Sequence, residues 1–115
     1  MSANPFWSGQ RFAFNKVLGT GDGDTEIVAT PGSGKTLYIE HLTVTITTAA
    51  AQAFDIEDDG GSPVEIFKAP ASLAVGSYYV NHGPLGFPLT ANTALQYDCA
   101  AAGVGLTVSG YGHVR

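Results

Sequence analysis

The sequence contains few charged side chains. Asp, Glu, Lys and Arg make up 13% of its 115 residues, about half of the roughly 25% that is usual in soluble domains. From residue 69 to residue 115, the only formally charged side chains are Asp98 and Arg115. Surfaces that are covered by other subunits are depleted of charge. This distribution therefore favours a protein that works within an assembly over a free monomer.

Basic side chains and long apolar runs are also scarce. The five Lys and Arg residues are scattered along the chain, and the net charge is −5 with histidine neutral. Binding to a phosphate backbone requires clustered Lys and Arg, so nucleic acid is not an expected partner. No apolar run approaches the roughly 18 residues of a membrane-spanning helix, so a membrane is not an expected partner either.

Residue patterns typical of catalysis are missing as well. The single cysteine, Cys99, cannot form an internal disulfide and lies in an alternating apolar run, as a buried strand residue would. His41, His82 and His113 lack the short spacings of a metal site. There is no Gly-x-Ser-x-Gly nucleophile motif. The sequence therefore predicts neither an enzyme nor a resident cofactor or metal.

One motif is typical of nucleotide-binding proteins. Residues 29–36 read Ala-Thr-Pro-Gly-Ser-Gly-Lys-Thr, which matches a Walker A phosphate loop except that Ala29 replaces the first glycine. Such a loop requires a helix that begins at its Ser or Thr, because the helix N-terminus binds the phosphate. Leu37–Thr48 is instead rich in Thr, Ile and Val, which favour strands. We interpret the motif as a turn that joins two antiparallel strands and leaves Lys35 exposed.

The strand predicted after this turn changes phase. Apolar residues occupy odd positions up to Ile39 and even positions from Leu42 onwards. A pattern with a period of two cannot change phase unless one residue is inserted. The sequence therefore predicts a β-bulge near Glu40 and His41.

Most of the remaining chain consists of short stretches with a period of two, separated by Gly, Pro, Asn or Asp. They lie at residues 11–18, 26–30, 54–57, 64–68, 76–81, 85–89, 95–99 and 106–111. Eight or nine short strands without a helical period are typical of a β-sandwich or barrel. We predict an all-β, antiparallel β-sandwich of about eight strands, jelly-roll-like, as a single domain over residues 11–115 that follows an N-terminal arm at residues 1–10.

Two segments carry candidate functional groups. Phe6 and Trp7, in the arm, are too apolar to remain in water, so they either fold back over one end of the core or dock into a neighbouring subunit, where Trp is a favoured anchor. The predicted hairpin at residues 54–68 holds the densest charge, which we interpret as a solvated tip rather than a metal site. Its acidic residues are Asp55, Glu57, Asp58, Asp59 and Glu65.

Three segments resemble parts of small virion proteins of tailed bacteriophages. Residues 28–42 resemble the segment of those proteins in which a turn and a Gly-Lys pair precede a strand. Residues 83–95 resemble their segment of an apolar strand, a turn and an Ala-Leu strand. Residues 105–111 resemble their final strand. The resemblance implies a β-sandwich that decorates a capsid or forms part of a tail or fibre, often as a trimer. It carries no catalytic residues.

On this basis we predict a capsid decoration or cement protein, located on the capsid surface of a virion and bound to the major capsid protein or other virion subunits. The alternative is a tail, fibre or receptor-binding module, with a sugar stacked on Trp7, Tyr78, Tyr79 or Tyr111. The candidate partner-binding residues are Phe6, Trp7, Arg11, Tyr78, Tyr79 and Phe87.

Overall fold

The computed structural model describes residues 10–48, 52–99 and 103–115. All regular structure in these residues is β-strand, which confirms the all-β prediction. The strands are β1 (Arg11–Leu18), β2 (Thr25–Val28), β3 (Leu37–Thr48), β4 (Phe54–Asp58), β5 (Glu65–Ala69), β6 (Gly76–Asn81), β7 (Phe87–Pro88), β8 (Leu95–Cys99) and β9 (Gly105–Val114). No helix in these residues is long and apolar enough to cross a membrane.

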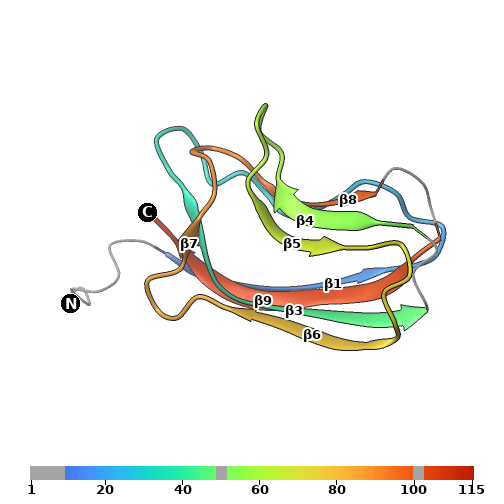
Figure 1. Cartoon of the computed structure of the whole chain (residues 1–115). Coiled ribbons are helices and arrows are strands. Elements are labelled where there is room, and N and C mark those ends of the chain that lie inside the picture. Colours follow the sequence, from blue (N-terminus) through green and yellow to red (C-terminus); the bar gives the residue numbers. More distant parts are fainter. Residues whose placement is uncertain (1–9, 49–51, 100–102) are drawn as a thin grey trace.

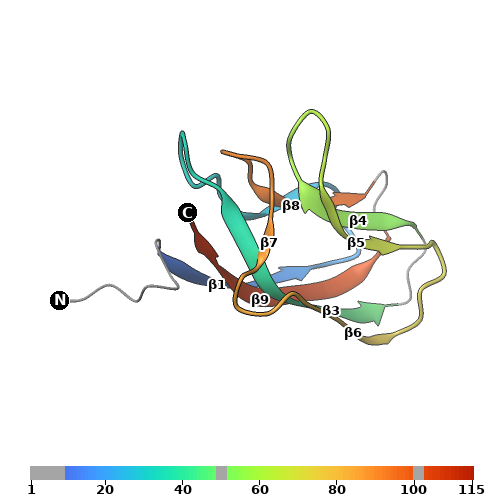
Figure 2. The same cartoon turned by 60° about the vertical axis from the view of Figure 1, so that its left-hand side comes forward.

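The strands form two antiparallel sheets that pack face to face (Figure 1). One sheet has the order β1-β9-β3-β6, with the two-residue β7 paired to β3 (Figure 2), and the other has the order β2-β8-β4-β5. The chain crosses between the sheets at most of its connections, so neighbours within a sheet are mostly distant in sequence. Eight main strands connected in this way form a jelly roll, as predicted.

The core lies between the two sheets. Successive residues of a strand point to opposite faces of its sheet, and most of the residues that point inward are apolar. Full burial of each such side chain contributes about 1.5 to 3 kcal/mol. The central members are Leu42, Val44, Ile46, Leu106 and Val108 on one sheet and Phe54, Ile56, Leu95 and Tyr97 on the other.

The predicted bulge in β3 is confirmed. The register between β3 and β9 shifts between Ile39 and His41, so Glu40 is the additional residue. The bulge reverses the parity of the strand. His41 and Thr43 consequently face outward, while Leu42 joins the core.

The segment that resembles a phosphate loop is a turn, because β3 begins at Leu37 where a helix would be required. Gly32 and Gly34 adopt positive φ angles of 114° and 77°, which suit glycine. The N–H of Lys35 donates to the carbonyl of Gly32 at 3.1 Å, and its side chain is exposed. One detail of the prediction is wrong: the turn joins β2 to β3, which belong to different sheets and do not pair.

Candidate functional site

The outer face of the β1-β9-β3-β6 sheet carries no Asp, Glu, Lys or Arg over three successive rows of paired residues. We call these rows the uncharged face. Their side chains lie opposite the core because they alternate with buried residues along each strand. The rows are Ala13, Tyr111, His41 and Asn81; Asn15, Ser109, Thr43 and Tyr79; and Val17, Thr107, Thr45 and Ser77.

Three aromatic rings gather at one end of the uncharged face. The His41 ring stacks on Tyr111 with centroids 5.5 Å apart, and it lies 6.3 Å from the Tyr79 ring. Tyr79 is 69% exposed and Tyr111 is 44% exposed. The guanidinium of Arg11 lies 6.0 Å from the centre of the Tyr111 ring. We call His41, Tyr79 and Tyr111 the aromatic patch, because exposed aromatic groups beside Arg are typical of protein interfaces.

The structure separates the partner-binding residues that the sequence predicted. Tyr79 belongs to the aromatic patch, and Arg11 lies beside it. Tyr78 points to the other side of β6, where its ring lies 6.2 Å from Phe67 and its hydroxyl donates to the carbonyl of Ala74 at 2.8 Å. Phe87 is half-buried, with its ring 5.0 Å from that of His82. Phe6 and Trp7 lie outside the described residues.

Sequence reasoning missed the role of His41 in this patch. From the sequence, His41 was expected only to mark the position of the bulge. The parity change at Glu40 was the available signal, since it places His41 on the same face as Thr43. Its neighbours Tyr79 and Tyr111 come from β6 and β9, and only the strand order brings them together.

The outer face of the other sheet is acidic. Glu26 of β2 lies opposite Gln96 of β8, and β4 and β5 add further acids to the same rows. The one basic group on these rows, Lys68, lies 3.2 Å from Glu65. We call this surface the acidic face. Its residues are Glu26, Gln96, Glu57 and Glu65 in one row and Asp98, Asp55 and Lys68 in the next.

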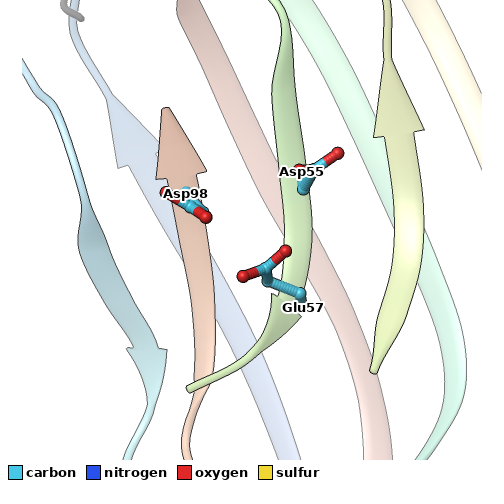
Figure 3. A group of neighbouring side chains, drawn as sticks. All are labelled: Asp55, Glu57 and Asp98. Atoms are coloured by element: carbon cyan, nitrogen blue, oxygen red, sulfur yellow. The ribbon is translucent and has the colours of Figure 1, made fainter. Parts of the chain in front are cut away.

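Three carboxylates of the acidic face lie close together (Figure 3). Asp55 and Glu57 of β4 and Asp98 of β8 each place one oxygen within 4.8 Å of the others. Burial is the largest of several effects that together raise the pKa of Glu57 to about 7; the others include a hydrogen bond with Asp98 and the negative charge of Asp98. Burial and the charge of Glu65 also raise the pKa of Asp55. The group therefore holds a proton near neutral pH, which relieves the repulsion between its charges.

This arrangement corrects the prediction of a solvated acidic hairpin tip. Glu57 and Asp58 are 4% and 0% exposed, whereas Asp59 and Glu65 are exposed as predicted. The Asp58 carboxylate accepts hydrogen bonds from the backbone N–H groups of Gly60 and Thr90, and both N···O distances are 2.9 Å. Burial opposes its charged form, but these hydrogen bonds lower the pKa of Asp58 overall. Asp58 is thus a buried anchor for two loops.

The sequence also did not reveal that Asp98 joins the acidic cluster. Asp98 lies opposite Asp55 in the register between β8 and β4. The two residues are far apart along the chain, and no local pattern links them. Carboxylate oxygens are the ligands that hard divalent cations prefer, but calcium takes six to eight oxygen ligands, and this cluster brings together only three carboxylate side chains.

A polar network surrounds the bulge residue, and it is buried at Glu40 and His113 but exposed at Arg11 and Arg115. His113 Nδ1 lies 2.8 Å from Glu40 Oε2, and Arg11 contacts both oxygens of Glu40, at 3.0 and 3.3 Å. Arg115 Nε donates to His113 Nε2 at 3.0 Å. Since Nε2 accepts a hydrogen bond, Nδ1 carries the proton and donates to Glu40. Both nitrogens are occupied, so this Glu-His pair lacks the free nitrogen that a general base needs.

Comparison with protein-family models gave no match, and comparison with curated protein sequences gave none either.

Proposed function

We propose that this chain is a structural subunit of a virion, a capsid decoration or cement protein that binds the major capsid protein on the assembled head. The observation that carries the proposal is the contrast between the two outer faces of the sandwich. One face carries no formal charge over three rows, whereas the other gathers acidic residues. Depletion of charge is typical of a surface that a partner covers, and an acidic surface suits contact with water.

The mechanism of such a protein follows from mass action. A subunit that binds only the assembled shell stabilises the shell in proportion to the binding free energy of each copy. The uncharged face supplies hydroxyl groups, as in the Thr45–Ser77 contact at 3.2 Å, and these can exchange hydrogen bonds with a partner without removing a charge from water. The resemblance to small phage virion proteins agrees with this role and implies a trimer.

The first experiment locates the protein. An antibody against the purified chain, tagged with gold, is applied to intact particles of the encoding virus and viewed by electron microscopy. The proposal predicts label distributed over the head. Label confined to the tail would contradict it, and so would the absence of label from particles that contain the protein by mass spectrometry.

A second experiment tests the face. Thr107→Glu introduces a charge in the third row of the uncharged face, while Ser62→Glu introduces the same charge at an exposed loop position on the β4–β5 connection. We expect Thr107→Glu to lower occupancy on heads that lack the protein by at least about tenfold, since a buried unpaired charge costs more than 1.4 kcal/mol. Ser62→Glu should bind as the wild type does.

A tail or receptor-binding module is the second candidate. It is favoured by one observation, the presence of exposed Tyr79 and Tyr111 beside the polar side chains of Asn81 and Thr43. Aromatic rings flanked by hydroxyl and amide groups suit a sugar. Gold label on the tail, together with binding to a glycan array that Tyr111→Ala abolishes, would establish this candidate in place of the first.

A further inference from the structure

We infer that the aromatic patch receives the N-terminal arm, residues 1–10, of a second copy of this chain. The inference extends the proposed assembly role to contacts between copies. It is tested on the isolated protein, so its failure and the failure of the virion role are distinguishable.

The receiving surface is exposed and lies at an unprotected edge. β6 is an outer strand of its sheet, and its six residues contain no charge and no proline. Natural proteins usually protect exposed edge strands with charges, prolines or bulges, because such edges bind other chains. The pairing of β6 with β3 is regular along its length, so there is no bulge either. Tyr79 stands on this edge with more than two thirds of its surface exposed.

The chemistry of the arm matches this surface. Residues 1–10 contain no Asp, Glu, Lys or Arg, and they contain Phe6 and Trp7 in succession. Aromatic rings pack on one another in offset or tilted arrangements that add about 0.5 to 1.5 kcal/mol to the burial of their area. The acidic face offers no comparable partner, because its rows are made of Glu, Asp, Gln and Lys.

The path of the chain favours a second copy over the same copy. The N–H of Val114 donates to the carbonyl of Gln10 at 2.8 Å, so pairing with β9 continues past the start of β1. The chain at Gln10 therefore runs along the sheet and away from the patch. Beside the patch, Arg115 lies 4.2 Å from the centre of the Tyr38 ring and donates to the carbonyl of Leu85, so these groups already have partners within the same copy.

The arm is long enough to reach a neighbour. The nine residues before Gln10, in extended conformation, would span up to roughly 30 Å. This length exceeds the 27 Å intermediate dimension of the molecule. An arm that binds a different surface on the next copy makes a head-to-tail contact, and such contacts close into rings when the rotation allows. A trimer of this kind would bury each arm on one neighbour.

Complementation between two variants is the decisive experiment. One variant lacks residues 2–9 and keeps the patch; the other carries Tyr79→Ser with Tyr111→Ser and keeps the arm. Each is measured alone and in an equimolar mixture by sedimentation velocity. We expect the wild type to form a closed oligomer, each variant alone to be monomeric, and the mixture to form one-to-one dimers with the single intact junction.

Trp7 supplies an independent readout, because it is the only tryptophan of the chain. Its fluorescence should shift to shorter wavelength as the wild-type concentration rises, and it should stay at the solvent-exposed wavelength in the patch variant. Val75→Ser, which changes another exposed apolar residue outside the patch, is the control and should oligomerise normally. Circular dichroism verifies that each variant is folded.

Three results would overturn the inference. The first is an oligomer that survives removal of residues 2–9. The second is a buried Trp7 in a monomer at every concentration, which would mean that the arm binds its own chain. The third is a Trp7 that stays exposed to solvent in the wild-type oligomer.

Discussion

Glu40 and His113 form a buried pair, with 2.8 Å between the carboxylate and the imidazole Nδ1. Glu40 is the extra residue of the bulge in β3, and His113 lies near the end of β9. Burial raises the pKa of Glu40, but hydrogen bonds from His113 and Arg11 outweigh this effect and lower it overall. The bulge therefore has a structural purpose, because it turns a carboxylate towards two partners that are distant in sequence.

Glu40→Gln should destabilise the fold by about 3 kcal/mol, because it removes a carboxylate charge that is 5% exposed and that His113 and Arg11 both contact. The free energy of unfolding in urea measures this change. Glu26→Gln is the matched control, since it removes the same charge from an exposed position on β2 and should change stability by less than about 0.5 kcal/mol. Equal effects of the two substitutions would contradict a stabilising role for the network.

The contribution of Glu40 should depend on pH in a defined direction. Its folded pKa is lower than the ordinary value of 4.5, so the stabilisation is present above that value and is lost as pH falls through the folded pKa. We expect the difference in stability between the wild type and Glu40→Gln to shrink below pH 4.5. A difference that stays constant down to pH 2 would show that the carboxylate charge is not involved.

Glu57 should have the opposite dependence. Its pKa is about 7 in the folded protein and has an ordinary value of 4.5, so the folded state binds more protons than the unfolded state between these values. The contribution of Glu57 to stability should therefore be greatest below pH 4.5 and should be lost as pH rises through 7, by roughly 3 kcal/mol at most. The groups that face Glu57 are Asp98, Asp55 and Glu65, all acidic.

Urea unfolding of the wild type and Glu57→Gln between pH 4.5 and pH 8 tests this dependence. The substitution should remove most of the decline, because glutamine has no proton to lose. Asp59→Asn, an exposed neighbour in the same hairpin, should retain the wild-type decline. Parallel curves for the wild type and Glu57→Gln would show that this carboxyl does not titrate near neutral pH.

Gly110→Ala should be poorly tolerated. A Cβ at Gly110 would overlap the carbonyl oxygen of His41 on β3 and would lie 2.8 Å from the Phe14 ring. Such overpacking typically costs about 1 to 3 kcal/mol, and here one neighbour is backbone, so we expect the upper end of that range. Gly61→Ala is the control, since a Cβ there meets no heavy atom within 4 Å. Thermal unfolding of both variants gives the comparison, and a similar midpoint for both would contradict the packing described here.

Lys35→Ala should leave stability within about 0.5 kcal/mol of the wild type, because the side chain is exposed. Titration of the wild type with ATP and Mg²⁺ should show no binding, because the helix that a phosphate loop requires is replaced by β3. Micromolar binding that Lys35→Ala abolishes would overturn our interpretation of this segment.

Several features were predictable because they depend on short stretches of chain. The change of phase between Ile39 and Leu42 predicted the bulge at Glu40, and the bulge is present. Pro and Gly in residues 31–34 predicted a turn, and both glycines adopt positive φ angles. The acidic hairpin was predicted as a hairpin, but the burial of Glu57 and Asp58 was not, since their neighbours on β8 and near residue 90 are remote in sequence.

Strands, turns and the all-β class could be predicted from the chain alone, because a period of two and the conformational needs of glycine and proline act over a few residues. Which side chains share a surface depends instead on the fold. In a jelly roll the paired strands lie far apart along the chain, so the meeting of His41 with Tyr79 and Tyr111, and of Asp55 with Asp98, follows from strand order and register. The same long-range pairing divides the molecule into one uncharged and one acidic face.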